Sequence, residues 1–228
     1  MRPPRVKPAS VQDGVNLRVL GLRDYLGARC LLLNALYVPG ATLASTALEK
    51  YFKCILATTG VQANVHLDQL EDFKALFTAR GIRIFDELDP AFVDLLSKAY
   101  RLRYYDTIQS EVFGFLVWQF LGELDSTVAL IESRLAIGGA QGAPVFNPYL
   151  AAIESQDPAV CVENHVALRL DKKSFMERPG PAVMLSIGAA HGELLITASE
   201  GMAVANYDGR VQTLVKVEVS SGGAHRDA

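Results

Sequence analysis

The chain has 228 residues, 50% of them hydrophobic and 21% charged, which excludes wholesale disorder and allows one large domain or two small ones. A formal net charge of −3 gives no overall electrostatic attraction to nucleic acid. The cysteines Cys30, Cys54 and Cys161 form neither a CxxC pair nor a disulfide framework, and we interpret them as buried thiols of a cytoplasmic protein.

The N-terminal segment MRPPRVKPASVQDG is basic and proline-rich but lacks the apolar core of a secretory signal. We expect residues 1–16 to form a flexible arm. No stretch reaches the roughly 18 uninterrupted apolar residues of a membrane-spanning helix. The most apolar segment, 112–125, is interrupted by Gln119, Glu123 and Asp125. We therefore expect a buried core helix there and no association with a membrane.

Apolar residues at helical spacing predict five helices, which short connections would arrange as an antiparallel bundle over residues 17–137. These helices are expected over 17–36, 41–60, 66–79, from Pro90 onward, and over 107–137. The polar surface of the first helix is predicted to include Arg18, Arg23, Asp24 and Arg29.

Local signals set the expected ends of these helices. Pro39-Gly40 predicts a break between the first two, and Gly60 predicts the end of the second. Asp89 is the expected N-cap of the fourth helix, with Pro90 in its first turn. On the second helix, the i,i+4 spacing of a glutamate and a lysine favours an ion pair; the two residues are Glu49 and Lys53.

After Gly138 the pattern changes from helical to alternating. We expect a linker over 138–160, a small antiparallel β region over 161–220 and a disordered tail over 221–228. The expected strands are HVALRLD (165–171), AVMLSI (182–187), ELLITAS (193–199) and a hairpin turning at Asp208-Gly209. A region of this length is expected to pack against the bundle, so the predicted fold class is α+β.

Three short motifs of the bundle resemble the HEPN-domain family. The segment LASTALEKYFKCIL resembles its second helix, in which an alanine-rich start precedes Glu49, Lys50 and Lys53. VHLDQLEDF is similar to the next element, in which a histidine, here His66, precedes a leucine-bearing helix. LRYYDTI resembles the RYP-D segment that opens the last long helix. Its matching residues are Arg103, Tyr104 and Asp106, with Tyr105 in place of the proline.

The resemblance covers about residues 17–137 and implies a helical bundle that dimerises. Many family members are metal-independent ribonucleases of toxin or defence systems, with an arginine followed after four to six residues by a histidine. The histidine moves the ribose proton and the arginine stabilises phosphate charge. Here Asp106 stands five positions after Arg101, and no histidine lies between His66 and His165. Family members without that histidine are suspected of binding nucleotides or acting as partners of small nucleotidyltransferases.

Each candidate site residue has a functional and a structural interpretation. Arg101 and Arg103 would form an anion site at the start of the last helix, or would pair with Asp106 or Glu49. His66 would approach these arginines as a substitute base, or would only bond locally at a helix start.

Three further side chains complete the candidate ligand-binding set. Tyr104 would stack on a base, or would belong to the core. Lys50 and Lys53 would extend a basic strip, or would form a solvated helix face.

The leading hypothesis is a non-catalytic, dimeric HEPN-like binding or adaptor module for a nucleotide, RNA or partner protein in a bacterial-type cytosolic system. One alternative is a divergent metal-independent ribonuclease of toxin or defence type, using Arg101 or Arg103 with Asp106 or His66. Another is a structural dimer whose β region recruits a partner strand. A clustered basic surface patch would favour the first two hypotheses, and a buried ion pair of Arg103 would favour the third.

A homodimer is expected through the last long helix, because its apolar face exceeds what one bundle seam needs. The residues of this face are Phe113, Leu116, Val117, Trp118 and Phe120. No cofactor is expected. His165 and His191 have no cysteine or carboxylate at ligand spacing, so the sequence predicts no metal site.

Overall fold

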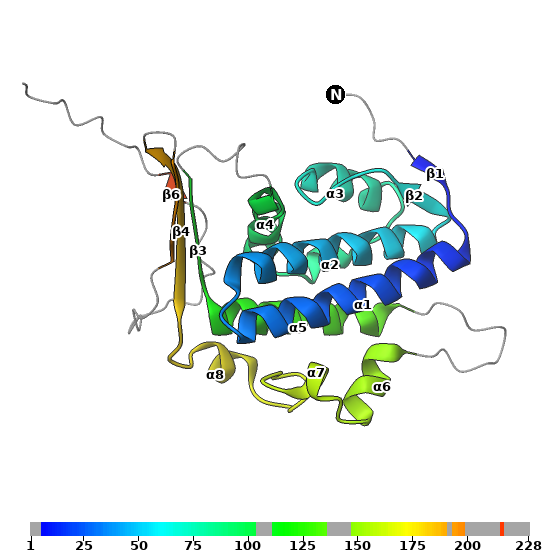
Figure 1. The fold of residues 1–228 in the computed structure, drawn as a ribbon. Coiled ribbons are helices and arrows are strands. Elements are labelled where there is room, and N and C mark those ends of the chain that lie inside the picture. Colours follow the sequence, from blue (N-terminus) through cyan, green and yellow to red (C-terminus); the bar gives the residue numbers. More distant parts are fainter. Residues whose placement is uncertain (1–5, 104–110, 136–146, 191–192, 199–214, 217–228) are drawn as a thin grey trace, which may run out of the picture.

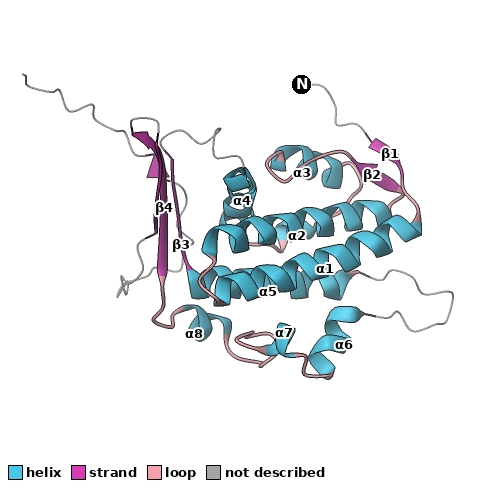
Figure 2. Cartoon of the chain, viewed as in Figure 1, coloured by secondary structure: helices cyan, strands magenta, loops and turns pink. Residues whose placement is uncertain are grey.

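The computed structural model describes residues 6–103, 111–135, 147–190, 193–198 and 215–216. Figure 1 shows a bundle of long helices with a small sheet standing at one end of it, and short helices running along one side. The predicted α+β class is confirmed: helices dominate, and the strands form small antiparallel sheets, as Figure 2 shows.

The main helices of the bundle are α1 (Val11–Leu33), α2 (Tyr37–Thr58), α4 (Pro90–Ala99) and α5 (Val117–Arg134). The shorter helices are α3 (Leu70–Thr78), α6 (Pro148–Glu154), α7 (Pro158–Cys161) and α8 (Lys172–Met176). Two 3₁₀ turns cover Ile84–Asp86 and Tyr100–Arg103. Among the described residues, no helix is long and apolar enough to cross a membrane.

Two antiparallel sheets accompany the bundle. The first pairs β1 (Val6–Pro8) with β2 (Val61–Ala63). The second has the strand order β5-β4-β3-β6. Its strands are β3 (Glu111–Leu116), β4 (Ala182–Ala190), β5 (Glu193–Ala198) and β6 (Val215–Lys216).

The N-terminal boundary differs from the prediction of a flexible arm over 1–16. β1 pairs with β2, and α1 begins at Val11 because Ser10 and Asp13 form a reciprocal capping box. The Ser10 hydroxyl accepts from the Asp13 amide, and the Asp13 carboxylate accepts from the Ser10 amide. Residues 6–16 are therefore ordered by a strand partner and a helix cap.

Pro39-Gly40 does not break the helix as predicted but lies in the first turn of α2. Proline is tolerated there because the first amides of a helix have no intrahelical acceptor. Gly40 allows α1 to approach closely, since a Cβ at this position would lie 2.8 Å from Cγ of Leu32. The other boundaries agree with the sequence: Asp89 caps α4, and Gly60, after the end of α2, has a positive φ.

The expected long helix over 107–137 is the largest error of the sequence analysis. Residues 111–116 of this range form the strand β3, which pairs with β4 in register from Glu111↔Ile187 to Leu116↔Ala182. The helix α5 starts only at Val117. An apolar run without a clear period suits a strand as well as a buried helix. The distant strand β4 decides between them.

The C-terminal third also departs from prediction. The expected linker contains α6 and α7, which start at the Asn147-Pro148 and Asp157-Pro158 caps. HVALRLD is not a strand but a series of turns, because the Asn164 side chain accepts from the amides of Val166 and Ala167. The strands expected at 182–187 and 193–199 are β4 and β5. The hairpin turn Asp208-Gly209 lies outside the described residues.

The apolar face that suggested a homodimer is largely covered by the chain itself. Val117 and Phe120 are buried in the core, and Leu116 is half-buried. Trp118 packs against Phe175 of α8, with ring centroids 5.8 Å apart. The side chain of Phe113 lies outside the described residues. The homodimer stays a prediction, but this face no longer supports it.

The interpretation of the cysteines as buried thiols is correct for only one of the three. Cys54 is buried beneath α1, and its thiol donates to the carbonyl of Gly14. Burial raises the pKa of the Cys54 thiol to about 12. Cys30 is exposed and Cys161 is half-buried. Cys30 escapes burial because it falls on the solvent side of α1.

Candidate functional site

Two of the sequence candidates, Lys53 and His66, meet in one polar cluster, the His66 cluster, formed by Glu49, Lys53, His66 and Tyr100. Glu49 is almost buried, and its carboxylate accepts from Nζ of Lys53 at 2.7 Å and from the amide of Leu67 at 3.0 Å. The predicted Glu49–Lys53 pair is thus confirmed. It also holds the segment before α3 against α2.

His66 is neither inside α3 nor restricted to local bonds. The helix begins four residues later at Leu70, and the His66 amide donates to the side chain of Gln69. Its Nδ1 lies 3.3 Å from Oε1 of Glu49 and 3.2 Å from the hydroxyl of Tyr100. The expectation that His66 is the first residue of this helix is therefore wrong, although its amide does make a local bond. The imidazole joins three elements.

The protonation of Nδ1 determines which neighbour His66 bonds. A protonated Nδ1 donates to Glu49, whereas an unprotonated Nδ1 accepts from the Tyr100 hydroxyl. The side chain is 51% exposed, and Nε2 makes no hydrogen bond within the described part of the chain. The site therefore holds one side of an imidazole in place and leaves the other available.

The arginines do not stand at a helix N-terminus as expected. Arg101 and Arg103 belong to the 3₁₀ turn that continues α4, and α5 starts at Val117, beyond β3. The anion site predicted from a helix dipole and two guanidiniums is wrong in this respect. Arg101 is exposed. The side chains of Arg103, Tyr104 and Asp106 lie outside the described residues.

Lys50 and Lys53 do not form a basic strip. Lys50 pairs with Asp24 of α1 at 2.5 Å, whereas Lys53 pairs with Glu49 at 2.7 Å. Both lysines are half-buried, so neither forms the solvated face that was the alternative. Opposite charges neutralise both lysines, because Asp24 of α1 and Glu49 of α2 each supply a carboxylate.

Arg101 lines a groove between α3 and α4 with a volume of about 470 Å³. The groove also includes Asp68 and Gln69, which follow His66 closely in the chain. Its charges are mixed, and several are already paired: Lys74 with Glu71 at 2.7 Å and Lys98 with Asp94 at 2.6 Å. Arg101 makes no ion pair with the residues that the structure describes.

Two buried ion pairs in the bundle were missed by the sequence analysis. Arg18, expected on the surface, is 3% exposed and donates from Nε to Glu132 at 2.9 Å. Arg29 is fully buried and donates to both oxygens of Asp125. The hydroxyl of Tyr51 donates to Glu132 at 2.7 Å, so that carboxylate has partners on two helices.

The second pair also connects the bundle to the C-terminal region. The hydroxyl of Tyr25 donates to Asp125 at 2.8 Å and accepts from the buried side chain of Asn164 at 3.0 Å. Arg29 additionally donates to the carbonyl of Val162. Burial raises the pKa of Asp125 to about 6 even though Arg29 lowers it, which shows how costly this charge is to enclose.

A spacing signal for the buried arginines was present in the sequence. Arg18 and Arg29 repeat at helical intervals with the apolar residues of the buried face of α1, which are Leu22, Tyr25 and Leu32. Asp125 and Glu132 are seven residues apart and occupy the apolar face of α5. Two cations and two carboxylates on facing helices predict buried pairs rather than solvated charges.

His165 is a core residue. It is 4% exposed, its Nε2 lies 3.1 Å from the Ser126 hydroxyl, and its ring packs on Phe175 at 5.2 Å. Burial lowers the pKa of His165 to about 4, so the imidazole is neutral near pH 7. Among the described residues, no three histidine, cysteine or carboxylate side chains converge as metal ligands would.

Comparison with protein-family models, with curated proteins and with solved structures finds no match to this chain. Its own geometry is therefore what bears on its function.

Proposed function

We propose that this chain is a HEPN-like binding module that acts as an adaptor for a partner protein and carries out no chemistry of its own. The observation that carries the proposal is the neutralisation of the two candidate lysines. Lys50 and Lys53 are each held by a carboxylate, and the groove beside Arg101 contains charges of both signs. A polyanion such as RNA is bound by unpaired, clustered cations, whereas a mixed surface suits a protein.

The positions of the family-like motifs support the HEPN-like part of the proposal. Glu49 and Lys53 lie on the second long helix, and His66 precedes the next helix. Arg101 follows α4, and a long helix, α5, comes later in the chain. The strand β3 before α5 is a departure from the five-helix pattern that the resemblance implies.

The proposal is tested by isolating complexes of the tagged full-length chain from its native cells. The wild type is compared with Arg101→Glu, at the exposed groove, and with Arg23→Glu, a matched change at an exposed position of α1. We expect a protein that accompanies the wild type and Arg23→Glu but is lost with Arg101→Glu, and that re-forms a stoichiometric complex from purified components.

Direct binding measurements supply the opposing outcome. Fluorescence anisotropy of labelled RNA and of a labelled adenine nucleotide should show no saturable binding at physiological salt. Micromolar RNA binding that weakens steeply with salt and is lost in Arg101→Glu would contradict the adaptor function and identify the chain as a nucleic-acid-binding module.

A divergent ribonuclease is the second candidate, and the orientation of His66 favours it. Its Nδ1 faces Glu49 and Tyr100, its ring is half-exposed, and its Nε2 makes no hydrogen bond with the described residues, so the imidazole is free to transfer a proton. End-labelled RNA incubated with metal-free protein tests this candidate. Cleavage that survives chelator but is lost in both Arg101→Ala and His66→Gln would establish the ribonuclease. RNA that stays intact at high protein concentration would exclude the ribonuclease and support the adaptor function.

A further inference from the structure

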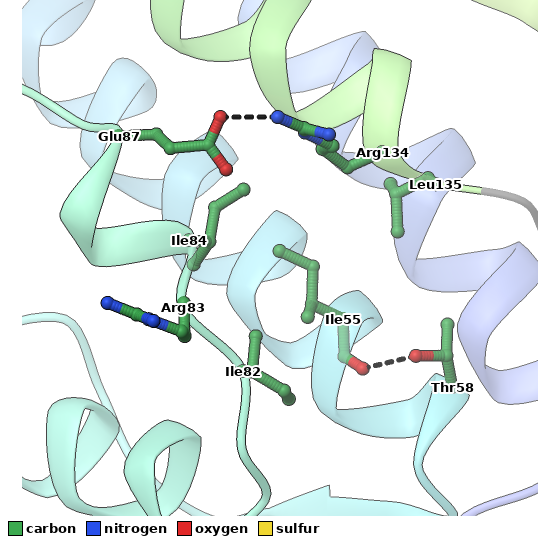
Figure 3. A pocket seen from close by; sticks show the side chains of 8 residues that line it. All are labelled: Ile55, Thr58, Ile82, Arg83, Ile84, Glu87, Arg134 and Leu135. Carbon is green, nitrogen blue, oxygen red and sulfur yellow. Dashed lines mark hydrogen bonds and ion pairs between the residues drawn. The ribbon is translucent and has the colours of Figure 1, made fainter.

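Three distant segments enclose a second hollow, remote in sequence from Arg101. It lies between the end of α2, the 3₁₀ turn at Ile84–Asp86 and the end of α5, and has a volume of about 400 Å³. Figure 3 shows four aliphatic side chains turned toward one another there, while Arg83 points away from them. These four residues are Ile55, Ile82, Ile84 and Leu135.

The floor of this hollow is apolar and its rim is charged. Ile55, Ile84 and Leu135 are between 6% and 8% exposed. Glu87 and Arg134 form an ion pair at 2.5 Å along one side of the hollow, and their side chains are 42% and 59% exposed. An exposed pair of this kind contributes little stability, so a ligand with its own charges replaces it at small cost.

The lining limits the chemistry of the occupant. The four floor residues are aliphatic, so the floor matches an aliphatic group, and among the described residues no aromatic ring lines the hollow for a nucleobase to stack on. A carboxylate beside Arg134 and an ammonium beside Glu87 would exchange one internal ion pair for two external ones. An aliphatic side chain between one acidic and one basic residue supplies the aliphatic group, the carboxylate and the ammonium.

We propose that this hollow, the Ile84 pocket, binds an aliphatic side chain of the partner protein that is flanked by one acidic and one basic residue. The inference rests on the adaptor function proposed above and supplies the anchor of its interface. Interfaces concentrate their binding energy in a few side chains that fill such hollows, surrounded by a polar rim. The volume of about 400 Å³ has room for one side chain and part of its main chain.

The probe is the peptide N-acetyl-Glu-Leu-Lys-amide, titrated into full-length protein labelled at isoleucine δ1 methyl groups. We expect saturable NMR shifts of Ile55, Ile82 and Ile84, while the methyl of Ile153 on α6 stays in place. Replacing the peptide leucine with alanine should weaken binding about tenfold. Replacing both charged residues with glutamine should weaken it about fivefold.

Variants of the rim and the floor test the same contacts from the protein side. In Glu87→Gln and Arg134→Gln the advantage of the charged peptide over its glutamine analogue should fall below about twofold. Ile82→Thr should weaken both peptides by about tenfold. The matched control Lys98→Gln removes a similar exposed pair in the other groove and should leave both affinities unchanged.

The inference is overturned if the peptide produces no shifts at its solubility limit, or if the alanine and glutamine analogues bind equally well. Free leucine binding as tightly as the peptide would also overturn it, by making an amino acid the occupant. Failure of the pocket is distinguishable from failure of the adaptor function. If the partner is lost with Arg101→Glu but retained by Ile82→Thr, the adaptor function is supported and only the role of the Ile84 pocket is rejected.

Discussion

Asp125 shows how much a single side chain contributes here. It lies fully buried on α5, where Arg29 and Tyr25 satisfy its oxygens. Enclosing such an ion pair is costly, but removing one partner is costlier, because the remaining charge stays in a medium of low dielectric constant. The network therefore makes α1 and α5 dependent on each other.

Replacing Asp125 with alanine should lower the free energy of unfolding by about 3 to 5 kcal/mol, since Arg29 would be left buried without a counter-charge. Urea denaturation followed by circular dichroism measures this change. The exposed carboxylate Asp94, paired with Lys98, is the control, and Asp94→Ala should cost less than about 1 kcal/mol. Similar losses for the two variants would contradict a buried pair at Asp125.

His165 makes the stability depend on pH, with a defined sign. Its pKa is lowered from 6.5 to about 4 by burial, so between these values the unfolded chain binds a proton that the folded chain does not. The contribution of His165 to the free energy of unfolding is complete above pH 6.5 and is lost as the pH falls toward 4. Between pH 7.5 and pH 5 the loss should reach about 2 kcal/mol.

The matched variant is His165→Gln, which retains a polar contact for Ser126 but does not titrate in this range. Urea unfolding at the two pH values should give the wild type a larger loss of stability than the variant, by about 2 kcal/mol. Parallel losses in the two proteins would show that His165 takes up its proton equally in both states.

At the scale of the elements, the junction between α8 and β4 is held by an aromatic contact. The guanidinium of Arg178 lies 4.0 Å from the ring of Trp118, whose Nε1 donates to the carbonyl of Pro179 at 3.1 Å. Gly180 makes this possible, because a Cβ there would lie 2.2 Å from Trp118 Cδ1 and Nε1. The indole thus occupies the space that a side chain at position 180 would need.

Gly180→Ala should displace the indole and lower the free energy of unfolding by about 1 to 3 kcal/mol. Trp118 is the single tryptophan, so its fluorescence should shift to longer wavelength as the ring becomes wetter. In a Trp118→Leu background the same glycine change should cost less than about 1 kcal/mol, because the clash is absent. An unchanged spectrum would show that the chain at 180 relaxes instead.

At the scale of the whole molecule, the C-terminal region completes the bundle instead of following it as a separate unit. Tyr149, Val160, Asn164 and Phe175 are each at most 2% exposed. Asn164 and the carbonyl of Val162 bond the buried residues Tyr25 and Arg29, and β4 supplies the partner of β3. Without the C-terminal region, the helices α1 to α5 therefore lack several of their bonding partners.

A chain ended after residue 137 should fail to form a cooperative, monodisperse fold. Circular dichroism, thermal unfolding and size-exclusion chromatography would show this loss. A chain ended after Lys216 is the control, because it keeps every contact that the structure describes, and it should unfold close to the full-length temperature. A folded fragment of 137 residues with a similar midpoint would show that the bundle is an independent domain.

The candidate site was predictable in part. The pairing of Glu49 with Lys53 follows from i,i+4 spacing on one helix. That Glu49 also binds the backbone before α3, and that Tyr100 meets His66, depends on how α2 and α4 pack. The Ile84 pocket had no signal in the chain, since its lining comes from three separate segments.

By itself the sequence determined features that depend on neighbours within a few positions. These include the cap at Asp89, the end of α2 near Gly60, and the strands β4 and β5, because capping and periodicity are local. Only the tertiary structure decided that β3 is a strand and which carboxylate pairs with Arg29. β3 pairs with β4, and the charge of Arg29 is neutralised by Asp125, 96 residues away. Their conformation depends on partners that no local pattern contains.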